Sequence, residues 1–223
     1  MEVVKVRRSA SGKTTYENYA NNQERLMAGT SRGEGLILPA HFGAVQDGRV
    51  FVVNLGTETT PIAFAKTAYD ADQPQLVIDV PVGTTIMPLS MKFVAETEAG
   101  TLSEVIFSVS QTLTGAGTST ALTPVNARVQ VAGTAPSTAC SVYSLYTGNG
   151  TAPSGGYEFA RFSSPFVLSD GDPLSDNRMQ WKAADEGWAP MLEGGSSLLV
   201  HASATTTQIT GYLTVVWWEM DTN

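Results

Sequence analysis

The sequence predicts an all-β protein built as a sandwich of two packed sheets. From residue 36 onward, hydrophobic side chains recur with a period of two, which is typical of strands. Gly, Pro, Asn and Asp separate the short apolar runs, and no segment shows the pattern of a long helix. With 223 residues, 42% of them hydrophobic, the chain is long enough for one sandwich domain with a substantial core.

The apolar runs place the strands in order along the chain. They predict strands over residues 48–56, 60–68, 75–98, 102–111, 126–133, 138–148, 157–164, 196–203 and 208–220. The run 75–98 contains two strands, because the sequence VPVG at 80–83 makes a bend. Roughly eight to ten strands without a long helix predict a β-sandwich of the jelly-roll type, which we assign to residues 36–223.

Two long connections interrupt this pattern. Residues 112–124 are small and polar, and they predict a mobile loop. Residues 168–195 are richer in large side chains and contain Trp181 and Trp188. Because long loops in compact domains are usually functional or lie at interfaces, both tryptophans are candidate interface residues.

Residues 1–35 lack a clear period and predict an extended N-terminal arm that becomes ordered on a neighbouring molecule. Its candidate contact residues are Tyr16, Tyr19 and Arg25. The arm carries six basic and four acidic residues, whereas the rest of the chain carries seven basic and seventeen acidic residues. The acidic body argues against nucleic-acid binding by the sandwich, because phosphate contacts need Lys and Arg. Two roles of the arm stay open: the arm is solvated or bound to a partner, or the weakly basic arm contacts nucleic acid.

The last strand is apolar on both faces. Ile209, Gly211, Leu213, Val215 and Trp217 share one face, which has the composition of a core face. The opposite face carries Thr210, Tyr212, Thr214, Val216 and Trp218, where a solvated strand would carry charged residues. We therefore expect Tyr212 and Trp218 to contact another sheet, the arm or another subunit. Coverage by long loops of the same chain is the alternative.

No catalytic arrangement emerges from the residue pattern. The sequence SGKTT at 11–15 lacks the Gly that a phosphate-binding loop requires at position 7, where this chain has Arg. His41 and His201 are the only histidines and are expected to be structural, with His41 in a loop. Cys140 is the only cysteine and is expected to act as a small buried hydrophobe. We therefore expect neither an enzyme nor a cofactor.

One acidic cluster has the chemistry of a cation ligand set. Asp170, Asp172 and Asp176 lie within seven residues, and carboxylate oxygens are the ligands that Ca²⁺ prefers. The spacing is not that of a helix–loop–helix calcium site, and Asp-Gly and Asp-Pro pairs also form ordinary turns. The three aspartates are kept as a weak calcium candidate.

The order of features resembles that of viral, above all bacteriophage, structural proteins with a single jelly roll. These features are the polar arm, the run VIDVPVGTTIMPLSMKF and the tryptophan-rich last strand GYLTVVWWEM. The resemblance implies a virion protein that self-assembles and contacts other virion proteins, as a capsid shell or a decoration subunit. The start of the chain lacks the apolar stretch of a signal peptide, and no 18-residue apolar run exists. We expect synthesis in a host cytoplasm and no membrane association.

Two alternatives remain open. A trimeric sandwich resembling tumour necrosis factor-like or fibre-head domains would recognise a receptor or a glycan, with Trp181 and Trp188 stacking on sugars. An enzyme on a jelly-roll scaffold, such as a cupin, is the third class. Cupins need several His and a Glu around a metal, and two histidines separated by 160 positions argue against that arrangement.

Overall fold

The chain divides into two units, residues 1–47 and 48–223. The computed structural model describes residues 6–7, 27–28, 40–64, 68–97, 103–129, 136–148, 153–164, 178–204 and 209–221. In the first unit, β1 (Val6–Arg7) pairs in parallel with β2 (Met27–Ala28), and α1 spans Ala40–Gln46. The predicted boundary between arm and sandwich, near residue 35, lies outside the described residues. His41 belongs to α1, so its expected place in a loop is wrong.

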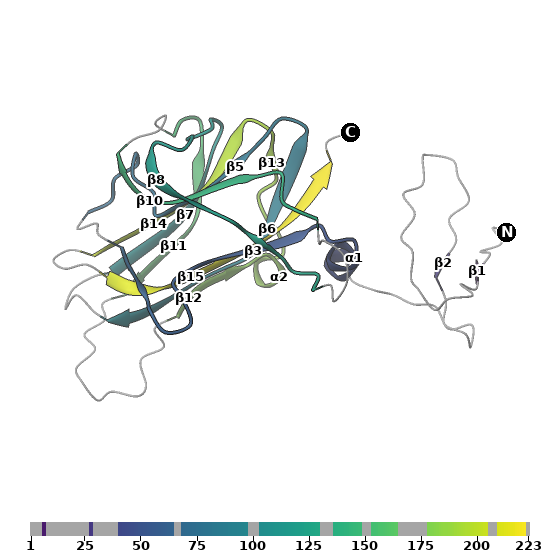
Figure 1. Ribbon diagram of the computed structural model, residues 1–223, viewed down its shortest axis with the longest axis horizontal. Helices are drawn as coiled ribbons and strands as arrows, with labels where there is room; N and C mark the ends of the chain where they lie inside the picture. The colour runs from purple at the N-terminus through teal and green to yellow at the C-terminus, as the bar shows by residue number, and fades with distance from the viewer. Residues whose placement is uncertain are drawn as a thin grey trace. The chain divides into compact units, whose positions relative to one another are not determined.

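The second unit is an antiparallel sandwich of two sheets (Figure 1). One helix, α2 (Ala183–Glu186), lies in this unit among the described residues. The strands are β3 (Val50–Leu55), β4 (Ile62–Phe64), β5 (Leu76–Val80), β6 (Thr84–Thr97), β7 (Ser103–Ser110), β8 (Thr118–Leu122), β9 (Val125–Asn126), β10 (Ser141–Gly148), β11 (Tyr157–Ser164), β12 (Arg178–Lys182), β13 (Leu192–Glu193), β14 (Ser196–Ala204) and β15 (Ile209–Asp221).

The strand order is that of a jelly roll. Eight of the described strands pair as one long hairpin rolled on itself: β3 with β15, β5 with β14, β6 with β12, and β7 with β11. Pairing of β15 with β6 and of β14 with β7 then completes the sheets. One sheet has the order β12-β6-β15-β3-β9, and the other has the order β11-β7-β14-β5-β10-β8. The predicted fold class is confirmed.

The remaining strands extend this framework and correct two sequence predictions. β8 pairs with β10, so residues 112–124 are not entirely a loop. The sequence concealed this strand because β8 is small, mostly polar and largely exposed, and carries no apolar alternation. The expected connection 168–195 contains β12 and β13, both paired with β6. In β12, Met179 and Trp181 alternate with polar residues, which is a strand pattern that the long loop assignment overlooked.

The core lies between the two sheets and is rich in aromatic side chains. Trp217, Phe93 and Met91 face inward from the β15 sheet, and Phe107 faces inward from the other sheet. The rings of Phe64 and Phe93 meet edge to face with centroids 5.1 Å apart. Each such buried side chain stabilises the fold by about 1.5–3 kcal/mol through removal of apolar surface from water.

Gly211 allows β15 to lie close against β6. A β-carbon at this position would lie 2.3 Å from the carbonyl oxygen of Val94. The pairing of β15 with β6 shifts register at the same point, between Thr210 and Gly211. Only glycine permits this approach, because any other residue would place its β-carbon in the neighbouring backbone.

Glu219 ties the end of β15 to the segment that leads into β10. Its carboxylate accepts hydrogen bonds from the Thr138 hydroxyl, the Ala139 N–H at 3.1 Å and the Trp217 indole N–H at 3.1 Å. The side chain is almost completely buried, so these donors replace the water that an exposed carboxylate would have.

Candidate functional site

The structure separates the candidate interface residues. Tyr16, Tyr19 and Arg25 lie outside the described residues. Tyr212 and Trp218 lie on the half-buried face of β15, as the alternation predicted. Trp188 follows α2 and is 48% exposed.

The assignment of Trp181 to an exposed interface loop is wrong. Trp181 lies in β12, is 2% exposed and packs edge to face on Phe159 with ring centroids 5.1 Å apart. The physical reason is the alternation in β12, which directs Met179 and Trp181 into the core. Trp181 and Trp188 therefore do not form a common sugar-stacking surface.

The outer face of β15 and its neighbours carries the apolar side chains Val52, Val94, Tyr212, Val216 and Trp218, and a polar row of Asn54, Thr214 and Lys92 lies between Tyr212 and Val216. Val216 is in register with Val52 of β3, and Tyr212 is in register with Val94 of β6. All five apolar side chains are partly exposed. Antiparallel sheets that face water usually alternate to polar residues on the outer side, so this composition suits contact with protein.

Parts of the sandwich itself cover some of this face. The guanidinium of Arg49 lies 5.9 Å from the ring centroid of Trp218, within the range of a cation–π contact. Tyr212 lies against Gly56, where a β-carbon would be 2.7 Å from its ring. Thr214 donates a hydrogen bond to Asn54 at 2.8 Å. The two candidate aromatic residues are therefore held in place by β3 and its flanks.

Asp79 anchors a loop across the outer face of the opposite sheet. Its carboxylate accepts the backbone N–H groups of Thr114 at 3.1 Å and Gly115 at 2.7 Å, and it lies 2.5 Å from the Ser197 hydroxyl. Asp79 and Ser197 are in register on adjacent strands. The buried aspartate in the apolar run LVIDV thus fixes the position of the loop that follows β7.

His201 is buried on this same outer face. Its Nε2 lies 3.3 Å from the carbonyl oxygen of Ala71, and its ring contacts that of Tyr69 with centroids 4.9 Å apart. Burial removes the imidazole from water and lowers the pKa of His201 to about 4. The ring is therefore neutral at pH 7, with Nε2–H donating to Ala71. Nδ1 is buried and has no hydrogen-bond partner among the described residues.

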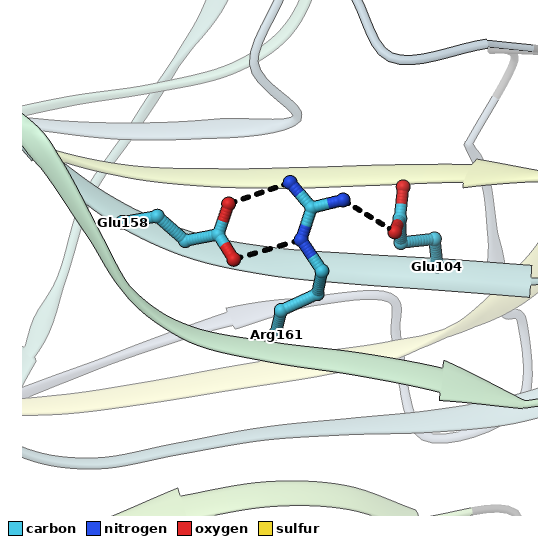
Figure 2. A network of polar contacts seen from close by, with 3 residues as sticks. All are labelled: Glu104, Glu158 and Arg161. Carbon is cyan, nitrogen blue, oxygen red and sulfur yellow. Dashed lines mark hydrogen bonds and ion pairs between the residues drawn. The ribbon is translucent and has the colours of Figure 1, made fainter.

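An ion-pair network lies on β7 and β11 (Figure 2), and Ile106 of β7 separates Arg161 from His201 in the strand register. Arg161 donates from Nε and one terminal nitrogen to Glu158 at 2.7 and 2.6 Å, and from its other terminal nitrogen to Glu104 at 2.7 Å. These hydrogen bonds lower the pKa of Glu158 below its usual value. The three side chains are partly exposed, so we regard the network as a charged surface feature rather than a source of stability.

Two adjoining clefts lie at one end of this sheet. The first, of about 340 Å³, is lined by Met191, Glu193, Gly194 and the end of β7. The second, of about 250 Å³, is lined by Tyr69, Ser108, Glu158, Leu199 and His201. Val109, Gly155 and Tyr157 line both clefts.

Sequence analysis did not single out Tyr69, Tyr157 or Asp79. Asp79 had a visible signal, since a charged residue inside a continuous apolar strand requires buried partners. The two tyrosines had no such signal, because they are 88 positions apart in the sequence and only the fold brings them together. A tyrosine in a loop and one at the start of a strand are both ordinary features.

The titratable groups form no metal centre in the part of the chain that the structure describes. No group of three or more His, Cys, Asp or Glu residues is placed there to hold an ion. Asp170, Asp172 and Asp176 lie outside the described residues, so the calcium candidate stays a prediction. Cys140 is buried in the core as expected, and burial raises the pKa of its thiol far above its usual value.

The described helices are too short or too polar to cross a membrane. Comparison of the chain with protein-family models, with curated proteins and with solved structures finds no match. The functional proposal therefore depends on the geometry of this chain alone.

Proposed function

We propose that the protein is a structural subunit of a virion, either a capsid shell or a decoration protein, that works by binding copies of itself. The observation that carries this proposal is the set of partly exposed apolar side chains on the outer face of β15. Val52, Val216 and Trp218 lie on one side of the polar row that contains Thr214, and Val94 and Tyr212 lie on the other. Exposed apolar side chains of this kind are typical of protein–protein contacts, where aromatic residues are enriched.

The fold and composition support self-association. A jelly roll offers two stiff sheet faces on which contact residues are held in fixed positions, and viral capsid domains commonly have this architecture. Only 15% of the residues are charged, so few charges would have to be desolvated when copies pack together. Symmetric assembly repeats one modest interface many times, which makes weak individual contacts sufficient.

A charge placed on the outer face of β15 tests this proposal. Val216→Lys should leave the fold intact, because Val216 is partly exposed and a lysine stem can extend to water in the single subunit. In an assembled interface the same ammonium would be buried without a partner, at a cost of several kcal/mol. We expect loss of the oligomer in light scattering with an unchanged circular dichroism spectrum.

The matched control is Ser163→Lys, which adds the same charge on an exposed position of β11 in the opposite sheet. Assembly of this variant should equal that of the unmodified protein. If Val216→Lys assembles as well as the control, the outer face of β15 is not the contact surface.

The arm is tested separately by deleting residues 1–34. We expect a folded sandwich that assembles poorly, because the arm adds contact area between copies. Unchanged assembly of the truncated protein would show that the arm has no such role.

A further inference from the structure

The two clefts at the end of the β11-β7-β14 face adjoin each other and are together called the groove. They share Val109, Gly155 and Tyr157 as lining residues. We propose that this groove is a binding site for a linear oligosaccharide of neutral sugars. The proposal does not depend on the assembly of the protein, and it concerns a surface distinct from the outer face of β15.

The shape of the groove favours a chain of small units over a compact cofactor. Pockets for drug-sized ligands span roughly 300–1,000 Å³. The first cleft lies at the lower end of that range, and the second cleft is smaller. Because the two clefts share three lining residues, a ligand longer than one sugar unit can contact both. Gly156 lets the segment before β11 lie close against the end of β7, because a β-carbon there would lie 1.7 Å from the carbonyl oxygen of Val109.

Two exposed aromatic rings give the groove surfaces on which sugar rings can stack. Tyr157, which lines both clefts, is 54% exposed, and Tyr69, which lines the second cleft, is 50% exposed. Tyrosine combines a flat apolar ring with a hydroxyl group and has few rotatable bonds, so it binds polar ligands at a low entropic cost. Met191, which is 63% exposed, provides a flexible apolar contact in the first cleft.

The polar groups of the groove match the hydroxyl groups of a sugar. Glu158 is held in a fixed orientation by its two hydrogen bonds from Arg161, and Ser108 and Glu193 also line the clefts. His201 lines the second cleft with a neutral ring that is almost completely buried.

The charges around the groove exclude anionic ligands. Among the described residues, Glu158 and Glu193 line the clefts, Arg161 pairs with Glu158 and Glu104, and Asp70 lies close enough to Tyr69 and His201 to influence both. Phosphate groups and sialylated glycans would meet a net negative field. A neutral saccharide avoids that repulsion and can still donate its hydroxyl protons to the carboxylates.

The test uses the full-length protein on an array of neutral oligosaccharides: gluco-, xylo-, manno- and N-acetylglucosamine oligomers. Sialylated oligosaccharides on the same array serve as the anionic comparison. The best neutral hit is then titrated calorimetrically against the unmodified protein, Tyr157→Ala and Trp188→Ala. Trp188 is a matched control, because it is a comparably exposed aromatic residue that lines neither cleft.

We expect binding of at least one neutral series, no binding of sialylated sugars, and at least tenfold weaker binding by Tyr157→Ala. Tyr157→Phe, which keeps the ring, should retain most of the affinity, and melting curves should show that all variants are folded. The proposal is overturned by an array without neutral hits, by unchanged affinity of Tyr157→Ala, or by loss of binding in Trp188→Ala instead. None of these outcomes bears on whether the protein self-assembles.

Discussion

Replacing His201 by Gln should reduce the amount by which the free energy of unfolding falls when the pH is lowered. His201 is 4% exposed and is surrounded by Tyr69, Ala71 and Leu199, with Asp70 nearby. Its pKa is about 4 in the folded protein, because burial disfavours the charged ring, whereas an unfolded histidine has a pKa of about 6.5.

The sign and size of the effect follow from this difference in pKa. Between pH 6.5 and pH 4 the unfolded chain binds a proton at His201 that the folded protein does not, so stability falls as the pH falls. The loss between pH 7 and pH 5 is about 2 kcal/mol, and it levels off near 3 kcal/mol below pH 4. Above pH 7 the residue contributes no pH dependence.

The assay is urea unfolding of both proteins at pH 7 and at pH 5. His41 and all carboxylates are present in both proteins, so their titration cancels when the two pH dependences are subtracted. The unmodified protein should lose about 2 kcal/mol more than His201→Gln over this interval. Equal losses would show that His201 is accessible to protons in the folded state and that its described burial is incorrect.

Two further changes test the packing of β15. Glu219→Gln should destabilise the fold by about 1–3 kcal/mol, since the amide cannot accept from all of Thr138, Ala139 and Trp217, and a buried donor loses its partner; unchanged urea unfolding would show that these hydrogen bonds contribute little. Gly211→Ala should destabilise by about 1–3 kcal/mol or more, because its β-carbon would meet the Val94 carbonyl oxygen. A melting temperature equal to that of the unmodified protein would contradict the close approach of β15 to β6.

The architecture could be predicted because the alternation of side chains records which face of a strand is buried. In β15, Leu213, Val215 and Trp217 are buried while Tyr212 and Val216 are partly exposed, as the period of two requires. Strand β8 could not be found in this way, since its stability comes from backbone pairing with β10 rather than from a buried face. The same principle applied to Met179 and Trp181 would have identified β12.

The groove could not be predicted, because its residues come from segments that only the rolled hairpin brings together. Tyr69 precedes β5, Tyr157 begins β11 and His201 lies in β14. Pairing of β7 with both β11 and β14 places these segments side by side, although each is unremarkable in its local sequence. Buried Asp79 was the one local signal that this face is covered by a loop.

The central claim, that this jelly roll works by binding copies of itself, is tested most directly by size-exclusion chromatography with light scattering on the full-length protein. Negative-stain images of each peak give the form of the assembly. We predict closed particles if the protein forms a shell, or a discrete small oligomer if it decorates one. A monomer that persists at the highest accessible concentration would contradict the claim and would reopen the enzyme alternative.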